Sequence, residues 1–440
     1  MLPVRRLLQR SAAGKSAWPS LLVTGDDMNG VKRGFRSSAP VERHPVMIGL
    51  LGMSIALTAH YTLRAHRRLQ AQKEAEPFER ATMVLGLDVG LTNTRLAGLD
   101  TNEGNENTIA TEPTSVQIRS GEVIVGALAV KNSVRRLRDE LQHDRPLVQL
   151  GVDADETDPS FKVDSMLTTL LGRLHDNVAS ALEKDEHDVP CVVALPTEFG
   201  DAEKDRLRAI LTEANMHVLG YLREPVAAMF ASNDWDETFR NAVVFDMGGV
   251  ESRCSVLDCS NPEAPSILST QATESLSGEV LDEAIIDVLA TDFERKNNIN
   301  LRTDSLAMDR LRDAAESAKK ELSTAKVSHI NLPFITADQK GAKHLEHALS
   351  QSTLQRLTFS SLEKSFKLIA SVLHEAKLEK QDIDAIIFCG GGMKAKYIQS
   401  EIATFLEHPT VVDVGNEEDA VVRGALKAGQ RYWYQKEMKD

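Results

Sequence analysis

The sequence predicts an α/β fold built from a duplicated, two-lobed unit, and two observations carry this prediction. The same pattern occurs twice, about 160 residues apart: an apolar, β-prone run ends in an aspartate, a glycine turn follows, and a second β-prone run leaves. The two aspartates are Asp88 and Asp246. Short β-prone runs also alternate with segments of helical periodicity, which is typical of α/β proteins. A chain of 440 residues is long enough for two domains or one large two-lobed domain.

Charge is divided unevenly along the chain. Residues 1–80 carry 13 Lys and Arg against 6 Asp and Glu, a net charge of +7, whereas residues 81–440 carry 38 against 59, a net charge of −21. So acidic a body argues against duplex nucleic acid as a partner, because neutralising phosphates requires clustered Lys and Arg. The cysteines form no Cys-x-x-Cys pair, so we expect buried, reduced thiols rather than a metal site or disulfides at Cys191, Cys254, Cys259 and Cys389.

The first 80 residues differ in kind from the rest. Residues 1–43 are rich in Arg, Lys, Ser and Ala and resemble a mitochondrial presequence, the alternative being a disordered basic tail. Residues 45–63 contain no Asp, Glu, Lys or Arg, and 19 residues of helix just cover the hydrocarbon layer, which predicts one transmembrane helix. We expect residues 64–80 to form a polar linker. Its positive charges favour a topology in which residues 81–440 lie on the matrix or cytosolic side of the membrane. We therefore expect a mitochondrial, membrane-anchored protein.

The body, residues 81–430, divides at the second aspartate pattern. We expect a first lobe over 81–240, and a second lobe over 241–430 whose C-terminal helix returns to the first; 431–440 is a tail. In the first lobe the periodicity predicts helices over 127–141, 164–183, 202–215 and 225–231 and strands over 189–195 and 217–222. In the second lobe it predicts helices over 278–296, 305–322 and from 416 to about 433, with a glycine cluster at 390–392 between a strand and a helix.

Six short strings then occur in an order that resembles the actin-like ATPase superfamily and, more closely, the nucleotide-binding domain of the heat-shock protein 70 family. They are GLDVG at 86–90, VALP at 193–196, REPVAA at 223–228, VFDMGG at 244–249, RLRDAAESAKKELS at 310–323 and CGGG at 389–392. The resemblance covers about residues 83–430. It implies two lobes around a nucleotide cleft, with ATP or ADP and Mg²⁺ as cofactors and a co-chaperone or another protein as partner.

The resemblance also implies a role for each matching residue. Asp88 and Asp246 would orient a hydrated Mg²⁺, Glu224 would orient the attacking water, and Lys131 is the candidate for the catalytic lysine. Pro196 matches a hinge proline, and Lys204 stands where the family usually has an arginine. The implied nucleotide-binding residues are Gly90, Leu91, Thr92, Asn93, Gly248, Gly249, Val250, Glu251, Gly278, Glu316, Lys319, Lys320, Ser323, Gly390, Gly391, Gly392, Met393, Lys394 and Glu418.

Several positions depart from the family pattern. Leu91 replaces a threonine, and a glycine, a threonine and an aspartate of the second loop become Val250, Glu251 and Arg253. A glutamate there would repel a terminal phosphate unless it is paired, and Arg253, two residues along the same strand, shares its face. Lys131 lies one residue further from its glycine than the family spacing. Losing such contacts slows phosphoryl transfer while adenine binding persists.

Two functions follow. The first is a slow, Mg²⁺-dependent ATPase that assists protein folding or protein handling; the alternative is a non-hydrolysing, nucleotide-sensing scaffold or regulator. A small-molecule kinase of the same superfamily would need a substrate-facing aspartate that the sequence does not reveal. Because the resemblance ends by about residue 427, we expect no peptide-binding domain in this polypeptide.

Overall fold

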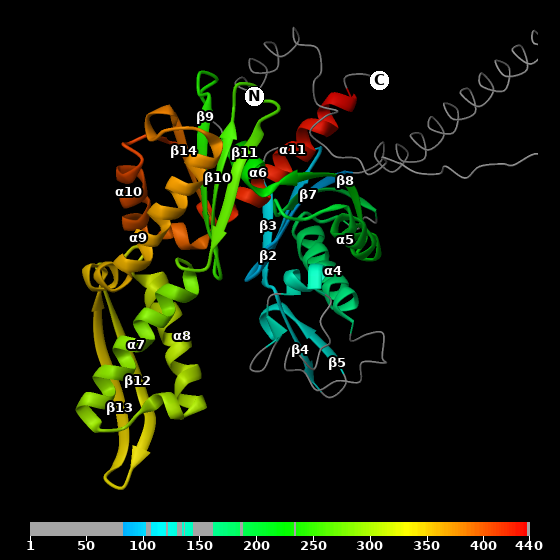
Figure 1. Cartoon of the computed structure of the whole chain (residues 1–440). Helices are drawn as coiled ribbons and strands as arrows, with labels where there is room; N and C mark the ends of the chain where they lie inside the picture. The colour runs from blue at the N-terminus through cyan, green and yellow to red at the C-terminus, as the bar shows by residue number, and fades with distance from the viewer. Residues whose placement is uncertain are drawn as a thin grey trace, which may run out of the picture.

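Two five-stranded sheets of identical strand order form the frame of the molecule (Figure 1). The computed structural model describes residues 82–102, 107–119, 122–129, 134–135, 137–143, 162–184, 188–232 and 235–437. The order is β3-β2-β1-β7-β8 in the first sheet and β11-β10-β9-β14-β15 in the second, so each strand of one has a counterpart in the other. The predicted α/β fold is confirmed, and the duplicated aspartate pattern opens each sheet.

The strands of the first sheet are β1 (Met83–Val89), β2 (Asn93–Asp100), β3 (Asn107–Pro113), β7 (Val189–Leu195) and β8 (Met216–Arg223). Those of the second are β9 (Asn241–Met247), β10 (Ser252–Asp258), β11 (Ser266–Thr273), β14 (Ala385–Cys389) and β15 (Thr410–Val411). In both sheets the first three strands are antiparallel and the last two join in parallel. Two smaller sheets contain β4 (Ser115–Arg119), β5 (Glu122–Val125) and β6 (Val134–Arg135), and β12 (Val327–Asp338) with β13 (Gly341–Ser350).

Helices connect and cover the sheets. In the first half they are α3 (Glu140–His143), α4 (Val163–Ala181), α5 (Asp201–Glu213) and α6 (Glu224–Ala231). In the second half they are α7 (Gly278–Asn297), α8 (Ser305–Glu321), α9 (Gln351–Ala376), α10 (Lys396–Phe405) and α11 (Ala420–Glu437). Short 3₁₀ turns include η3 (Gly126–Leu128), η4 (Leu137–Asp139), η7 (Leu301–Thr303), η8 (Lys380–Asp382), η9 (Gly391–Lys394) and η10 (Glu417–Asp419).

Local chemistry explains where the main helices begin. Ser277 caps α7 by accepting from the Val280 N–H at 3.3 Å, and Asp304 caps α8 by accepting from two backbone N–H groups. Pro225 stands in the first turn of α6, where its missing N–H costs no hydrogen bond. These residues place the helix starts within a residue or two of the predicted positions.

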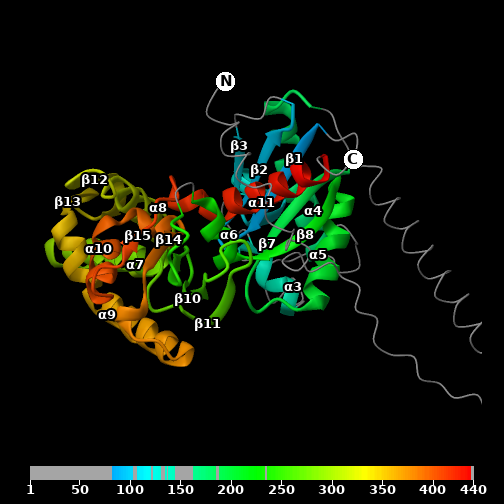
Figure 2. The ribbon, with the colours of Figure 1, turned by 90° about the horizontal axis from the view of Figure 1, so that it is seen from above.

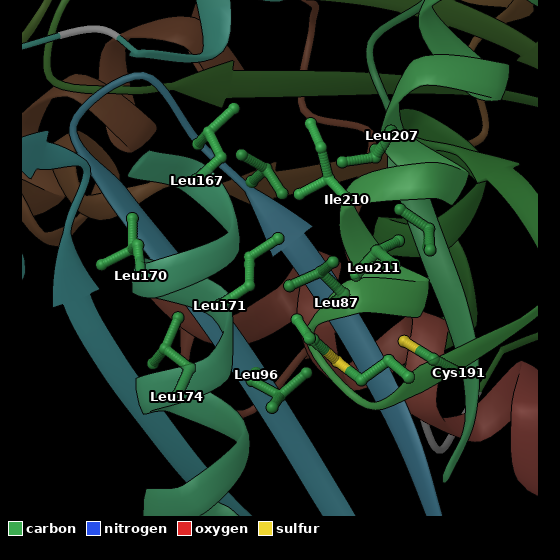
Figure 3. Packing of buried hydrophobic residues seen from close by; sticks show 14 of the residues in the cluster. Leu87, Leu96, Leu167, Leu170, Leu171, Leu174, Cys191, Leu207, Ile210 and Leu211 are labelled. Atoms are coloured by element: carbon green, nitrogen blue, oxygen red, sulfur yellow. The ribbon is translucent and has the colours of Figure 1, made fainter. Parts of the chain in front are cut away.

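Alternation along the strands divides the core of the first half into two layers. Leu87 of β1 and Cys191 of β7 face one side and pack with α4 and α5, where Leu171 and Leu211 are fully buried (Figure 3). Val84 and neighbouring strand residues face the other side, against α6 and α11. In the view from above, α11 runs along the first sheet towards α6, which lies near the centre (Figure 2).

The halves join through two counterpart helices, α6 after β8 and α11 after β15. A Cβ placed on Gly424 of α11 would lie 1.7 Å from the carbonyl oxygen of Ala227 of α6. The two backbones are therefore in direct contact, and only glycine fits at position 424. The helix expected to return from the second lobe thus packs on α6 and on β1, β2 and β7.

Some predictions did not hold or lie outside the described residues. The helix predicted over 127–141 is wrong: η3, β6, η4 and α3 take its place, because Val125 and Val134 pair with Val116 across the small sheet. The hairpin of β12 and β13 and the long helix α9 were not predicted. The predictions for residues 1–43, 45–63 and 64–80 concern residues outside the described part of the chain. Within that part, no helix combines the length and apolar character needed to cross a membrane.

Candidate functional site

Two equivalent glycine turns meet at the centre of the molecule. The Gly90 N–H donates to the Asn93 carbonyl at 3.1 Å, and the Gly248 N–H donates to the Glu251 carbonyl at 2.9 Å, so both turns close four residues in the same way. A Cβ placed on Gly249 would lie 2.2 Å from the Thr92 hydroxyl oxygen. The turn of one half therefore touches the turn of the other, which places both next to one site.

Each aspartate lies opposite an arginine across its own hairpin. Asp88 of β1 is in register with Arg95 of β2, and Asp246 of β9 is in register with Arg253 of β10. Directly opposed residues in an antiparallel pair project from the same face, so each carboxylate has a guanidinium beside it. Gly390 closes over Asp246 with φ of +87°, and a Cβ there would lie 2.3 Å from the Asp246 Oδ1. The backbone conformation and the close approach both require glycine at that position.

Three carboxyl groups gather between the sheets: the buried Glu224 and the half-buried Asp88 and Asp246. Burial, together with the charges of Asp88 and Asp246, raises the pKa of Glu224 to about 8, although Arg138 opposes the shift. Burial and the neighbouring Asp88 raise the pKa of Asp246 to about 6. Burial likewise raises the pKa of Asp88, although Arg95 and Arg138 oppose it. The three groups influence one another, so their negative charge is concentrated in one place.

Two arginines neutralise part of this charge. Nη1 of the buried Arg138, in η4, donates to the Glu224 carboxylate at 3.0 Å, and its Nη2 is 3.8 Å from Glu251. Arg253 lies 3.0 Å from Glu251 and 2.7 Å from Glu198, which belongs to the segment after β7 of the first half. The predicted pairing of Glu251 with Arg253 is present. Glu251 thus joins an arginine from each half.

Arg95 makes a matching connection in the opposite direction. It extends from β2 to Glu418 at 2.6 Å and to Asp419 at 3.4 Å, both in η10 before α11. Glu418 also pairs with Lys394 of η9, as Glu417 pairs with Lys396. The aspartate-facing arginine of each half therefore binds an acidic segment of the other half.

Comparison with known proteins now adds to this geometry. A family described as Hsp70 protein matches residues 139–431, about two thirds of the chain. The chain belongs to the Hsp70 family. It is 29% identical over 377 residues to the chaperone protein DnaK of Buchnera aphidicola subsp. Schizaphis graminum, covering 79% of this chain and 59% of that protein. It is 29% identical over 379 residues to the chaperone protein DnaK of Carsonella ruddii, covering 79% and 63%. The chain thus spans about three fifths of the length of these relatives.

The glycine-rich segments of this Hsp70-family chain surround the same site. Gly391 lies near Glu418, and Gly392 packs on Met247, with Met393 buried beside them. Val250 is buried, whereas Leu91 is half-buried. The N–H groups of Gly278 and Glu279 donate to the carbonyls of Gly248 and Gly249, so within the protein they are already paired. Both N–H groups at the start of α7 therefore bond to the second turn, and the implied nucleotide-binding role of Gly278 stays a prediction.

Helix α8 brings one of its predicted residues to the turns. Lys319 donates to the Gly278 carbonyl at 3.1 Å and pairs with Asp282 at 2.6 Å. Lys320 and Glu316 pair with each other at 2.7 Å on the exposed side of the helix, and the Ser323 hydroxyl caps the last turn. Lys319 is therefore fixed next to the second turn. Lys320 and Glu316 lie on the neighbouring, exposed face of the same helix.

The predicted hinge residue Pro196 directly follows β7 and precedes Thr197 and Glu198, which contact Arg253. Arg223 donates to the Pro196 carbonyl at 2.6 Å and to the Phe199 carbonyl at 2.9 Å. Lys204 pairs with Asp201 at 2.8 Å, and its carbonyl accepts from the Tyr221 hydroxyl. A pocket between the halves is lined by Leu195, Lys204, Tyr221, Leu222, Arg223, Val226, Pro265 and Ile267. Lys131 falls outside the described residues.

Sequence reasoning missed three residues of this site, Arg138, Arg95 and Glu198. Arg138 was hidden in the segment wrongly predicted as helical. Arg95 had a usable signal, because it follows Asp88 by seven residues, as Arg253 follows Asp246. Glu198 had none, since only the packing of the halves brings it to Arg253.

The donor chemistry fits a hydrated divalent cation. Carboxylate oxygens are ligands that Mg²⁺ prefers, and the charge of Asp88 adds to burial in raising the pKa of Asp246, so a cation between the two carboxylates would relieve their repulsion. Among the described residues, no three His, Cys, Asp or Glu side chains form an inner-sphere metal set. A cation held largely through its water shell would agree with both findings.

Proposed function

We propose that this chain binds ATP and ADP at the two glycine turns and hydrolyses ATP slowly with Mg²⁺, in the service of protein folding or protein handling. One observation carries the proposal. Asp88, Asp246 and Glu224, from three separate elements, gather beside two touching glycine turns. Backbone N–H groups and glycines accommodate phosphates, and clustered carboxylates hold the accompanying cation.

The residues divide the work of hydrolysis. Asp88 and Asp246 would hold the hydrated Mg²⁺, which neutralises charge on the phosphates when it is bound. Glu224 would orient the attacking water and accept its hydrogen bond. Arg138 holds the Glu224 carboxyl in place from 3.0 Å and supplies a fixed positive charge near the transferring group. Phosphoryl transfer depends on such positioning and charge, so the geometry supports turnover.

A specific observation favours the second candidate, a non-hydrolysing, nucleotide-sensing regulator. Arg138 already pairs with Glu224, and Glu251 stands between Arg138 and Arg253. Both carboxyl groups are thereby bound to arginines, so Glu224 is not left to orient a water molecule. For a regulator of this kind, nucleotide binding would still form or break the arginine contacts between the halves. A partner protein could then respond to whether a nucleotide is bound.

We further propose the partner and the location. A co-chaperone or another protein would meet the chain at the pocket beside Lys204 and Arg223, where both halves contribute side chains. Residues 1–43 would direct the chain to mitochondria and residues 45–63 would anchor it in a membrane. Carbonate extraction of isolated mitochondria tests this location: retention in the membrane pellet supports the anchor, and release into the supernatant excludes it.

The decisive experiment combines calorimetry with phosphate release on the full chain. ATP and ADP are titrated with Mg²⁺, and phosphate is then followed in the same sample, for the wild type, for Asp246→Asn and for the exposed control Asp309→Asn. Turnover that is lost in Asp246→Asn and kept in the control supports the ATPase. Binding without turnover supports the regulator. Turnover equal in all three proteins excludes this site as its source, and absence of binding excludes both functions.

A further inference from the structure

Glu251 lies between two arginines that come from opposite halves of the molecule. Its Oε1 is 3.0 Å from Nη2 of Arg253 and 3.8 Å from Nη2 of Arg138. Its side chain is 26% exposed, so solvent and small ligands reach it. Its backbone carbonyl closes the second glycine turn with the Gly248 N–H. The carboxylate is therefore held at the turn that the proposed function assigns to phosphates.

Both arginines have other protein partners that fix their positions besides Glu251. Arg138 is buried and bonded to Glu224 at 3.0 Å, and it also donates to the Val89 carbonyl at 3.4 Å. Arg253 donates to the Thr197 hydroxyl at 2.9 Å and contacts Glu198 at 2.7 Å. Two anchored guanidinium groups with one exchangeable carboxylate between them form a site for a single anion. Guanidinium groups bind carboxylates and phosphates through the same charge-assisted hydrogen bonds.

We propose that the Glu251 carboxylate occupies the place that the third phosphate of a nucleoside triphosphate needs, so that the site selects a nucleoside diphosphate. The inference rests on the proposed nucleotide binding. A third phosphate here meets a like charge or displaces the carboxylate from two guanidinium groups, and either costs affinity. A diphosphate ends before this position and leaves the arginine bridge between the halves intact.

The same assignment explains the departures in the second turn. A threonine at position 251 would leave the space between the two arginines open for a phosphate, whereas a glutamate supplies the anion from within the chain. Arg253 in place of an aspartate completes the pair, because an aspartate would repel Glu251. The replacements at positions 251 and 253 are therefore coupled, because each charge is compensated by the other. The resulting protein responds to a diphosphate.

The test compares the affinities of ADP and ATP for the full chain by calorimetry at fixed Mg²⁺, with phosphate release followed in parallel. The variants are Glu251→Gln, which keeps the size of the side chain, and Glu346→Gln, which removes an equal charge from an exposed position of β13, away from the two glycine turns. We expect the wild type to bind ADP about tenfold or more tightly than ATP. The ratio should fall to about threefold or less in Glu251→Gln, because the amide no longer repels a phosphate. It should stay within about twofold of wild type in Glu346→Gln.

The outcomes separate the inference from the function on which it rests. Equal or tighter binding of ATP by the wild type overturns the inference and leaves the proposed nucleotide binding intact. A preference for ADP that persists in Glu251→Gln also overturns it, because another group is then responsible. Absence of binding of either nucleotide removes the proposed function and the inference together. Thermal unfolding of each variant confirms that it is folded, and Glu251→Ser replaces Glu251→Gln if the amide variant is not.

Discussion

The two sheets share their strand order and the register of their aspartate and arginine pairs, but they differ in what surrounds those pairs. The first turn carries Leu91, Thr92 and Asn93 and no charge, whereas the second carries Glu251. Arg95 connects to acids at the start of α11, and Arg253 connects to Glu198 after β7. The connection from β11 to β14 in the second half also contains α7, α8, the β12 and β13 hairpin and α9.

The shared parts build the site, and the unshared parts adjust its charge. Register and strand order are properties of backbone pairing, so both halves retain them with different side chains. The turn residues lie outside that pairing and are free to differ. The two sheets can in this way hold Asp88 and Asp246 at equivalent positions, while only the second turn carries an acidic side chain, Glu251.

The largest effect we predict comes from breaking the contact between the counterpart helices α6 and α11. Gly424→Ala places a methyl group 1.7 Å from the Ala227 carbonyl oxygen, so the helices must separate. We expect the free energy of unfolding to fall by about 3 kcal/mol or more, measured by urea denaturation.

A second glycine provides the matched control for this variant. Gly172 in α4 has no atom within 4 Å of an added Cβ, so Gly172→Ala should raise stability by about 0.5–1 kcal/mol through helix propensity. Equal effects of the two substitutions would show that the contact between α6 and α11 does not join the halves.

The two-sheet fold could be predicted from the sequence because the signals for its strands and helix starts are local. The aspartate and glycine patterns, the proline at the start of α6 and the caps of α7 and α8 each lie within a few residues. The site was reached only where the resemblance supplied it. Side chains that meet only through the packing of the two halves, such as Glu198 and Arg253, cannot be paired from their spacing in the sequence.

The wrong helix over 127–141 has a physical cause as well. Its basic and apolar residues fit helical spacing, but tertiary pairing of Val134 with Val116 outweighs that preference. This error concealed Arg138, which lies just beyond that strand. The β12 and β13 hairpin went unpredicted because its alternation is mostly polar, with Ile330 and Leu345 among its few buried residues.

An intermediate effect tests the two arginine connections against each other. Arg253→Gln removes contacts to Thr197, Glu198 and Glu251, and we expect a loss of about 2 kcal/mol. Arg95→Gln should cost about 1 kcal/mol, since Glu418 keeps its pair with Lys394. Chemical denaturation of both variants at low and high salt measures the difference. A larger loss for Arg95→Gln would reverse the ranking and place the stronger connection at the start of α11.

The last prediction, whose effect is small within one pH unit and accumulates over several units, separates the carboxyl groups of the two halves by pH. Glu224, whose ordinary pKa is 4.5, has a pKa of about 8 in the folded protein, and Asp246 rises from 3.8 to about 6. The folded chain therefore holds protons that the unfolded chain has released, so stability falls as pH rises from about 4 to about 8 and then levels. Each group contributes up to about 1 kcal/mol per pH unit within its own window. Glu224→Gln should flatten the curve between pH 6 and 8, where Glu224 alone titrates, and Asp246→Asn should reduce the slope below pH 6, where both groups titrate, as measured by urea denaturation across that range. Stability that rises with pH through this window would mean that the arginines, not burial, dominate both carboxyl groups.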